Sequence, residues 1–383
     1  MKGIIIGAGI GGLTTAIAFK KADIDYQIME AAPELQPVGA GIIMASNAMQ
    51  IFQRLGIEKK IREAGVEVES AFGVDQSFKV IFGLDVKNKV TPIYGIGSFA
   101  FHRGRLQQVL LSEIDSHKLS LNKRLISVEQ KKNNVLLLFE DGTSTEADFV
   151  IGADGIKSTV RKSIYGEVSY RYAHQTCWRG MATYTLPSEM KANSYEMWGN
   201  QKGLRFGFVP TGKNEVYFFT TYYTAKNGKD EPDKVKKKLV NLYSAFGEIP
   251  IQLIQVTPEE KIIRSDITDF VPIDRWFKER VALIGDAAHA TTPNLGQGGC
   301  QAVEDAFVIA RCLKEESSIQ LAFAKYQSVR FKKASHVVNL SWKFSELTNI
   351  GNPVFRWLRN SVMRMMPESM AIRELDKILR LNY

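Results

Sequence analysis

The fold of this chain is decided by the stretch Lys2-Gly3-Ile4-Ile5-Ile6-Gly7-Ala8-Gly9-Ile10-Gly11-Gly12. The apolar run up to Ile6 predicts a short buried strand, and the helical pattern over 13–22 predicts a helix directly after the glycines. In such a unit Gly7 permits the tight turn, Gly9 lets the backbone approach a pyrophosphate, and Gly12 lets the helix pack closely on the strand. The free N–H groups at the helix start attract phosphate. The stretch therefore predicts a phosphate-binding turn at the edge of a parallel sheet.

A second apolar strand over 26–29 ends at Glu30, eighteen residues after Gly12. An acidic residue about 20 residues after the glycines is the expected partner of the ribose hydroxyls in a dinucleotide site. A site for NADP would avoid a carboxylate at this position. The unit alone leaves open whether NAD or FAD binds.

Two further apolar strands each end in a tight turn with an aspartate. The first is 149–151, followed by Gly152-Ala153-Asp154-Gly155, and the second is 281–284, followed by Gly285-Asp286. Because ligands bind at the carboxyl ends of parallel strands, we expect Asp154 and Asp286 to lie around one ligand.

These three motifs, in this order and spacing, resemble those of the group A flavoprotein monooxygenases, the family with the para-hydroxybenzoate hydroxylase fold. The resemblance covers essentially the whole chain. It implies an α/β protein with a Rossmann-like FAD-binding domain, an inserted antiparallel-sheet substrate domain and C-terminal helices.

The resemblance also implies cofactor roles. Asp286 would hold the FAD ribitol, Arg103 would contact the phosphate and ribityl region, and Asp154 would serve both FAD and nicotinamide binding. Backbone near Leu125 would bracket the adenine, and the run 293–299 would offer N–H groups and a helix start to the anionic edge of the reduced flavin. The full set expected for FAD is Gly7, Gly9, Gly11, Gly12, Glu30, Ala31, Arg103, Leu125, Asp154, Asp286, Leu295, Gly296, Gln297, Gly298 and Gly299.

Structural roles are the alternative for some of these residues. Asp286 alone would be interpreted as a helix cap, and Arg103 alone as a surface cation near a helix start. The three motifs together favour the ligand-binding interpretation. His289 has no catalytic partner in the sequence, and we expect it to be structural.

The domains are expected to be discontinuous. We expect the FAD-binding domain to comprise residues 1–70, 100–165 and 275–320. The substrate domain is expected to comprise residues 71–99 and 166–274. Residues 321–383 are expected to form a C-terminal helical segment. Within the substrate domain, the aromatic-rich stretch 204–223 predicts a hairpin with a four-residue loop over 211–214.

Three polar residues stand out on the strands of the substrate domain, namely Arg179, Arg205 and Tyr217. Arg205 and Tyr217 lie where the family's urate hydroxylases place a catalytic arginine and a substrate-binding tyrosine. The resemblance thus implies a catalytic role for both and substrate binding by all three. Those enzymes have asparagine where this chain has Arg179, which predicts a substrate other than urate. A sheet-surface ion pair or an exposed hydroxyl is the structural alternative.

The C-terminal segment has apolar residues at helical spacing, including Phe355, Leu358, Val362 and Met366. Residues 353–383 contain six basic and three acidic residues, a net charge of +3. We expect this helix to cover the core of its own protein; the alternative is peripheral contact with an anionic membrane. The segment also resembles the C-terminal tails of monooxygenases related to zeaxanthin epoxidase, which favours a lipophilic substrate.

Composition narrows the class of protein. The 383 residues carry a net charge of +9, with basic residues spread along the chain, which argues against nucleic acid as a partner. The three cysteines have no paired spacing, which argues against disulfides and a metal site and favours a cytoplasmic protein. The uncharged stretch 3–19 is too short and too rich in glycine for a spanning helix. We expect a monomer or a homodimer.

The resemblance implies a monooxygenase in which NADH or NADPH, bound transiently, reduces FAD. Molecular oxygen then forms a flavin C4a-hydroperoxide, which hydroxylates or epoxidises a small aromatic, heteroaromatic or isoprenoid substrate. Two alternatives remain at this point: an FAD-dependent reductase or dehydrogenase of the same fold acting on an isoprenoid, and a non-catalytic FAD-binding protein.

Overall fold

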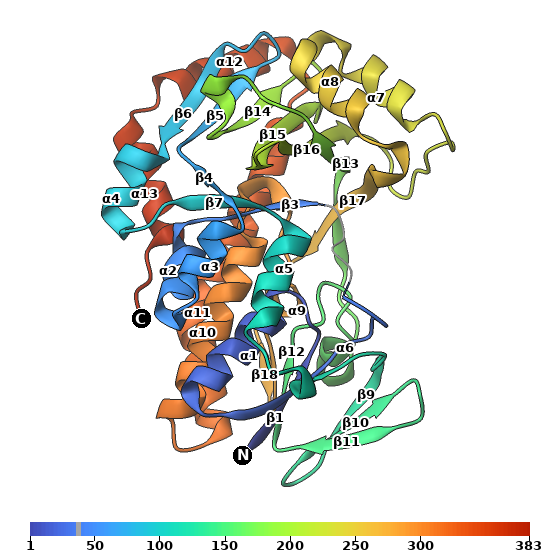
Figure 1. Ribbon diagram of the computed structural model, residues 1–383, viewed down its shortest axis with the longest axis vertical. Helices are drawn as coiled ribbons and strands as arrows, with labels where there is room; N and C mark the ends of the chain where they lie inside the picture. The colour runs from blue at the N-terminus through green and yellow to red at the C-terminus, as the bar shows by residue number, and fades with distance from the viewer. Residues whose placement is uncertain (36–39) are drawn as a thin grey trace.

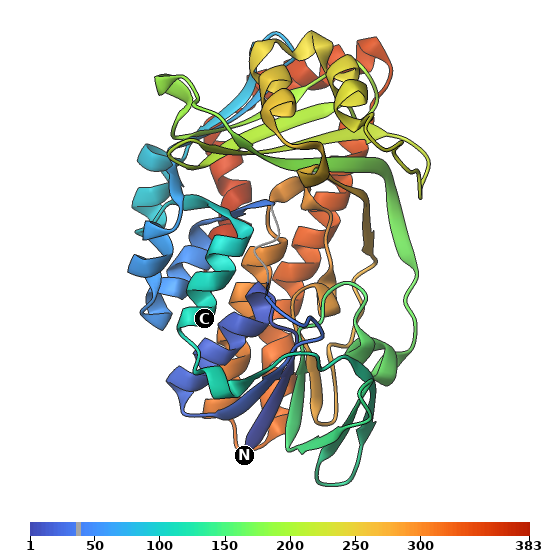
Figure 2. The same ribbon diagram turned by 45° about the vertical axis from the view of Figure 1, so that its right-hand side comes forward.

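The computed structural model describes residues 1–35 and 40–383. Two large sheets are stacked along the long axis of the molecule (Figure 1). The lower sheet is flanked by long helices, and the upper sheet is capped by shorter ones, as the turned view also shows (Figure 2). Candidate site residues come from both halves, so the site is built where the halves meet.

The lower sheet is the parallel sheet that the glycine stretch predicts. Its strands, in spatial order, are β18 (Phe277–Lys278), β19 (Val281–Leu283), β12 (Phe149–Gly152), β1 (Lys2–Ile6), β2 (Asp25–Met29) and β8 (Leu119–Ser120). All neighbours are parallel except β18 and β19. The carboxyl ends of β1, β12 and β19 therefore place the three motifs side by side.

Helices cover the lower sheet because its strands are apolar on both faces. The predicted first helix is α1 (Ile10–Ala22), and it packs against α10 (Gly298–Glu315), which is followed by the long α11 (Ile319–Thr348). The remaining helices of this half are α2 (Ser46–Leu55), α3 (Glu58–Glu63), α5 (Arg103–Ser112), α6 (Thr159–Tyr165) and α9 (Asp286–His289).

The upper sheet has seven strands. In spatial order they are β17 (Ile263–Phe270), β13 (Tyr170–Thr183), β16 (Glu215–Tyr223), β15 (Arg205–Gly212), β14 (Asn193–Trp198), β5 (Ser70–Asp75) and β6 (Val80–Asp85). Every pair is antiparallel except β14 and β5. On the outer face, α7 (Val235–Leu242) and α8 (Glu248–Val256) bury Leu239 and Leu253 against a second apolar core.

The predicted hairpin is present as β15 and β16, but the expected four-residue loop is too long. Gly212 pairs with Glu215, so the turn contains only Lys213 and Asn214. Thr211 belongs to β15 and is fully buried. Polar residues at a strand end resemble a loop in sequence, although here the ladder continues through them.

Two small sheets complete the frame. One, with β3 (Gly41–Met44), β7 (Ser98–His102) and β4 (Val66–Val68), contacts the upper sheet through β15. The other, with β9 (Leu125–Gln130), β10 (Val135–Phe139) and β11 (Ser144–Ala147), lies at the lower end (Figure 1). A π-helical turn over Val86–Val90 and α4 (Thr91–Tyr94) follow β6.

The C-terminal segment forms α12 (Pro353–Met365) and α13 (Glu368–Leu379). The expectation that its apolar stripe covers the protein's core is wrong: Phe355, Leu358, Val362 and Met366 are 40–60% exposed. The reason is that α12 packs through the opposite face, where Arg359 is buried against Trp198.

Among the described residues, no helix is long and apolar enough to cross a membrane. Within the same part of the chain, no cluster of three or more histidine, cysteine or acidic side chains is arranged to hold a metal ion.

Candidate active site

A cavity of about 920 Å³ lies between the two sheets and contains most of the predicted site residues. Those that line it are Gly7, Gly9, Gly11, Glu30, Ala31, Arg103, Leu125, Asp154, Arg179, Arg205, Tyr217, Asp286, Gly296, Gly298 and Gly299. Gly12, Leu295 and Gln297 are not part of its wall. Segments separated by more than 200 residues thus meet at one cavity.

The glycine turn after β1 has the close packing that its sequence predicts. Gly7 has φ +105°, and a β-carbon there would lie 2.6 Å from the Ala153 carbonyl oxygen. A β-carbon on Gly12 would lie 1.9 Å from the Gly7 carbonyl oxygen, so Gly12 serves helix packing rather than the cavity wall. At Gly9 a β-carbon would meet nothing within 4 Å. The space beside Gly9, at the start of α1, fits a pyrophosphate.

Glu30 is held beside this turn by backbone donors. Its Oε2 accepts a hydrogen bond from Ala8 N at 2.6 Å, and its Oε1 accepts one from Ala32 N at 2.8 Å. A carboxylate has about four acceptor positions, so two remain for the hydroxyls of a ribose.

The side chains of Asp286 and Arg103 face the cavity, and neither forms a hydrogen bond or ion pair with another described residue. Within residues 1–35 and 40–383, no donor lies within hydrogen-bonding distance of the Asp286 carboxylate, and the Arg103 side chain is exposed to the cavity. Burial raises the pKa of the Asp286 carboxyl, while nearby His289 and Arg103 oppose the rise. An acceptor and a cation left unpaired inside a cavity fit a ligand that carries hydroxyls and phosphates.

The run 293–299 begins with a short 3₁₀ turn (Pro293–Leu295) and leads into α10. Gly296 has φ +62°, and a β-carbon there would meet nothing within 4 Å. Two side chains of the run turn away from the cavity. Leu295 packs against an apolar cluster that includes Val337, and Gln297 is buried, where it accepts a hydrogen bond from Asn47 at 3.1 Å. The backbone of this run, rather than those side chains, therefore faces the cavity.

Asp154 lines the cavity but also organises the start of α6. Its carboxylate accepts hydrogen bonds from Ser158 Oγ at 2.5 Å and Val160 N at 3.0 Å. Burial raises the pKa of Asp154, and these hydrogen bonds oppose the rise. The structure thus gives Asp154 a structural task at the wall of the cavity.

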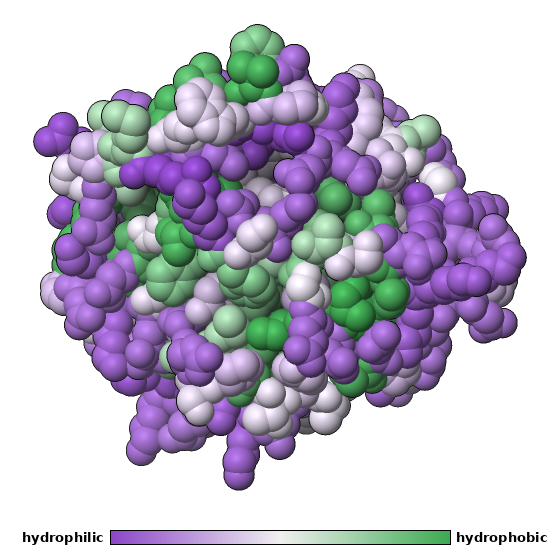
Figure 3. Space-filling model, turned by 90° about the horizontal axis from the view of Figure 1, so that it is seen from above, coloured by the Kyte–Doolittle hydropathy of each residue, from purple (hydrophilic) through white to green (hydrophobic). Residues whose placement is uncertain are grey.

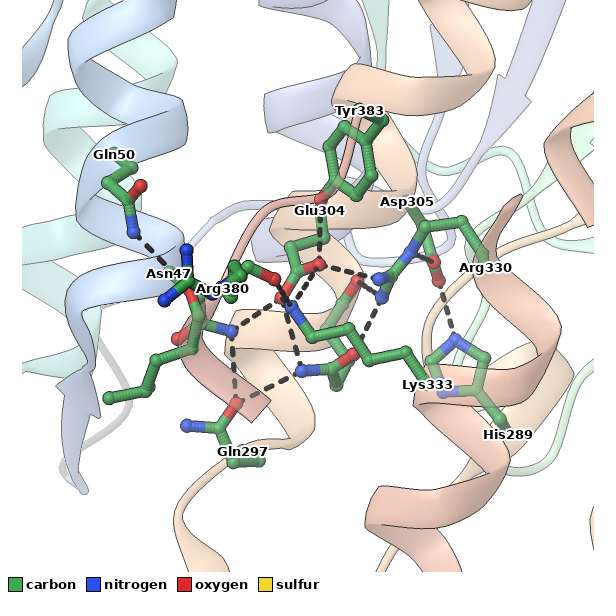
Figure 4. A network of polar contacts seen from close by, with 12 residues as sticks. Asn47, Gln50, His289, Gln297, Glu304, Asp305, Arg330, Lys333, Arg380 and Tyr383 are labelled. Atoms are coloured by element: carbon green, nitrogen blue, oxygen red, sulfur yellow. Dashed lines mark hydrogen bonds and ion pairs between the residues drawn. The ribbon is translucent and has the colours of Figure 1, made fainter. Parts of the chain in front are cut away.

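A polar network with a buried centre lies beside α10 (Figure 4). Asp305 accepts hydrogen bonds from Gly285 N at 2.9 Å and Arg330 Nε at 2.8 Å, and it lies 2.6 Å from His289 Nε2. Burial opposes ionisation of Asp305, but His289 and Arg330 lower its pKa to about 2. His289 is therefore part of a structural network, and Asp305 holds the turn that carries Asp286.

The same network ties distant chain segments together through Glu304. Its carboxylate accepts hydrogen bonds from Arg330 Nη1 at 2.5 Å, Lys333 Nζ at 2.8 Å, Asn47 Nδ2 at 2.6 Å and Tyr383 Oη at 2.6 Å. Both carboxylates and both cations of the network are therefore paired despite their burial, whereas the buried Oδ1 of Asn47 has no hydrogen-bond partner among the described residues.

The upper half of the cavity contains Arg179 and Tyr217. Arg179 Nη1 donates to Ser265 Oγ at 2.6 Å, and the pKa of Tyr217 is raised by burial, with Arg179 nearby opposing the rise. Tyr217 is therefore a neutral phenol at physiological pH. A β-carbon on Gly41 would lie 2.1 Å from the Tyr217 ring, so Gly41 lets this ring pack against β3. A cation and a neutral hydroxyl donor stand together in this half.

Arg205 is buried and its donors are largely used by the protein. It forms a 2.9 Å ion pair with Glu196 and donates to Gln175 Oε1 at 3.1 Å, Thr221 Oγ1 at 3.1 Å and Asn294 Oδ1 at 2.7 Å. Arg205 thereby joins four strands of the upper sheet to the run 293–299. This geometry supports a positioning role more directly than contact with a reacting atom.

Several cavity residues escaped prediction from the sequence. Glu196, Phe219 and Ile263 line the cavity. Nothing in the local sequence distinguishes them from ordinary strand residues. Only the pairing of Arg205 with Glu196 identifies one of them as part of the site.

Comparison with known proteins agrees with this geometry. A family model described as FAD binding domain matches residues 1–347. The chain is 39% identical to the aurachin C monooxygenase/isomerase of Stigmatella aurantiaca, over 95% of this chain and 94% of that protein. It is 31% identical to a 2-heptyl-3-hydroxy-4(1H)-quinolone synthase of Pseudomonas aeruginosa, over 96% and 94% of the two chains.

A solved structure extends the similarity to three dimensions. The crystal structure of Klebsiella pneumoniae HpxO complexed with FAD and uric acid matches with a TM-score of 0.90 and 27% identity, covering 99% of this chain and 96% of that one. The family match spans most of the chain, and the fold and the glycine, Asp-Gly and Gly-Asp motifs agree with it. The chain therefore belongs to the FAD-binding monooxygenase family.

Proposed function

We propose that this FAD-dependent monooxygenase hydroxylates a nitrogen-containing heteroaromatic ring of the 4-quinolone type that carries an alkyl or isoprenoid tail. The observation that carries the proposal is the pairing of the Arg179 cation and the neutral Tyr217 phenol with the apolar Phe219 and Ile263 in one half of the cavity. Support comes from the Pseudomonas aeruginosa relative, whose name describes a quinolone ring with a heptyl chain and a 3-hydroxyl group.

The residues of the upper half suit such a ring. Arg179 and the Tyr217 hydroxyl can bind a ring oxygen and stabilise negative charge on it, which raises electron density at the adjacent carbon. Phe219 and Ile263 offer apolar surface to the flat ring and its tail. Glu196 and Asn294 keep Arg205 in place, so the upper sheet stays fixed over the run 293–299.

The lower half suits FAD. The start of α1 and Gly9 would hold the pyrophosphate, Glu30 the ribose, and Asp286 with Arg103 the ribityl chain. FAD bound there supplies the redox chemistry, which is reduction by NADH or NADPH followed by activation of molecular oxygen. We also propose that the two sheets form a cofactor domain and a substrate domain with the boundaries expected from the sequence.

The test is a substrate screen with the FAD-loaded protein. 4-Quinolones with and without a long alkyl tail, and urate as a comparison, are added with NADH or NADPH while oxygen uptake, hydroxylated product and hydrogen peroxide are measured. We expect the tailed quinolones to stimulate oxidation and to yield product with one added oxygen atom. Stimulation that releases only peroxide would contradict the substrate class, and turnover without oxygen uptake would instead favour a reductase.

Arg179→Gln is expected to lower kcat/KM for the substrate by about 100-fold, because the variant loses a half-buried cation that would bind and stabilise the ring oxygen in its ionised form. FAD content should stay at the wild-type value, since Arg179 lies on the upper sheet. Steady-state kinetics and the visible flavin spectrum measure the two quantities. Lys213→Gln, which removes an exposed charge from the turn of the same sheet, is the control. Unchanged kinetics in Arg179→Gln would exclude the residue from substrate binding.

A further inference from the structure

Helix α12 is packed with its polar face inward. Residues 354, 355, 357, 358, 362 and 365 point outward, and their exposed fractions are Val354 67%, Phe355 60%, Trp357 66%, Leu358 50%, Val362 58% and Met365 82%. The inward face carries Arg359, which is buried, and Arg364, which donates to the Val80 carbonyl oxygen at 3.1 Å. A water-exposed helix normally has the opposite arrangement.

Further apolar residues are exposed just beyond α12. These are Met366, which follows the last residue of α12, and Met370 in α13. Figure 3 views the molecule from the end where Figure 1 places α12, and it shows hydrophobic residues exposed among hydrophilic ones on this face. Exposed apolar patches of this kind mark interaction surfaces.

A pocket of about 280 Å³ lies directly beside this face. Arg356, Arg359 and Arg364 all line it, together with Trp357. Arg359 stacks on the Trp198 ring at 4.4 Å and donates to the Leu347 carbonyl oxygen at 3.0 Å. Half of the lining residues belong to α12. The other half comes from 75–77 and 198–200 and includes the carboxylate of Asp75.

The positive charge in this pocket is incompletely balanced. Arg364 pairs with Asp75 at 3.4 Å, whereas no carboxylate of the described residues pairs with Arg356 or Arg359. Arg356 Nη1 is buried and has no hydrogen-bond acceptor among them. Burial, together with Arg356 and Arg205, lowers the pKa of Arg359 to about 10. An anion in the pocket would satisfy Arg356 and relieve this repulsion.

We propose that α12 docks the protein on the surface of an anionic phospholipid bilayer, with its exposed apolar face at the acyl boundary and a headgroup phosphate in the arginine pocket. Trp357 belongs to both features, since it is exposed and also lines the pocket. Tryptophan is enriched at the membrane–water interface for this combination of properties. The contact is peripheral, because no helix of the described residues can span a bilayer.

Charge favours a bilayer over a second copy of the chain. The acidic residues of the segment are already paired within the protein, as Glu368 with Lys89, Glu374 with Lys377 and Asp376 with Arg380. The segment keeps a net charge of +3 in a chain of net charge +9. Two copies joined through α12 would bring two such basic surfaces together, whereas phospholipid phosphates neutralise them.

The apolar face is tested by sedimentation of the FAD-loaded full chain with two kinds of vesicle, phosphatidylcholine alone and phosphatidylcholine mixed with phosphatidylglycerol. We expect wild type to sediment with the anionic vesicles. Leu358→Glu/Val362→Glu should lower the partition coefficient at least about tenfold, because it places carboxylates where acyl chains would lie. Ile126→Glu/Leu321→Glu changes two exposed apolar residues elsewhere and should sediment as wild type does.

The arginine pocket is tested by variants that each remove one positive charge. Arg356→Gln should lower the partition coefficient about fivefold, and Lys237→Gln, an exposed lysine on α7, should leave it nearly unchanged. If both variants lower the partition coefficient equally, the effect depends only on total charge. That result would overturn the assignment of the arginine pocket as a phosphate site.

Two other outcomes would overturn the proposal as a whole. If inorganic phosphate raises the melting temperature of wild type but not of Arg356→Gln, and no vesicle binds, the pocket takes a free anion. If wild type is a dimer by analytical ultracentrifugation, Leu358→Glu/Val362→Glu is a monomer and neither binds vesicles, the apolar face joins two copies. Both results are independent of the substrate screen, so failure of this proposal leaves the proposed function untouched.

Discussion

Asp286→Ala is expected to fold and to lose most of its FAD. In the structure the Asp286 carboxylate faces the cavity from the start of α9, and no donor of the described residues satisfies it. We propose that hydroxyls of bound FAD are its partners, so that the variant would lose hydrogen bonds to a charged acceptor. Loss of such hydrogen bonds should weaken FAD binding on the order of 100-fold. The measurement is the ratio of visible flavin absorbance to protein after purification, followed by titration with FAD.

Two control variants test whether the loss of FAD is specific to the Asp286 carboxylate. Asp286→Asn keeps an acceptor oxygen of the same shape without the charge, and it should retain more flavin than the alanine variant. Asp274→Ala removes an exposed aspartate outside the cavity and should keep the wild-type flavin content. Circular dichroism checks that each variant is folded. A flavin content equal to wild type in Asp286→Ala would remove the ribityl assignment.

Arg330→Met is expected to cost about 3 to 5 kcal/mol of unfolding free energy, because it leaves Glu304 and Asp305 buried without their shared cation. Arg330 is fully buried and reaches both carboxylates at 2.5 and 2.8 Å. For a chain of this length the loss corresponds to a fall in Tm of about 5 °C. Thermal unfolding followed by circular dichroism, with FAD in excess, measures it.

The matched control is Arg311→Met on α10. Arg311 pairs with Glu315 at 2.8 Å, but the pair is exposed, so its removal should change the unfolding free energy by less than about 1 kcal/mol. A similar Tm for the two variants would show that the buried network is not a main source of stability. Since Asp305 also holds Gly285, we expect Arg330→Met to bind FAD more weakly than Arg311→Met.

Much of the cofactor half could be predicted from local sequence. The predicted strand over 2–6 is β1 with the same bounds, and α1 and β2 differ from their predictions only at their starts. Hydrophobic periodicity and the placement of glycines are local signals, and a tight turn that lacks room for a β-carbon requires glycine wherever it occurs. The Gly-Asp turns after β12 and β19 follow from the same logic.

The sequence does not predict which groups a side chain contacts in the folded protein. The pattern of α12 indicates an apolar face, but it does not state whether that face meets the core or the solvent, and the expectation was wrong. Gln297 and Leu295 belong to the predicted run, yet their side chains turn away from the cavity. Arg205 was expected at the substrate, and the structure shows most of its donors used by Glu196 and three other residues.

By itself, the sequence determined the parallel sheet, the glycine turn and the positions of Glu30, Asp154 and Asp286, because each is encoded by neighbours along the chain. Only the tertiary structure decided which residues share the cavity with them. It also decided how Glu304 and Asp305 pair with Arg330 and how Asp305 holds the turn at Gly285. The physical reason is that a buried charge is stable only when its partners are in place, and here those partners come from opposite ends of the chain, as with Asn47, Glu304 and Tyr383.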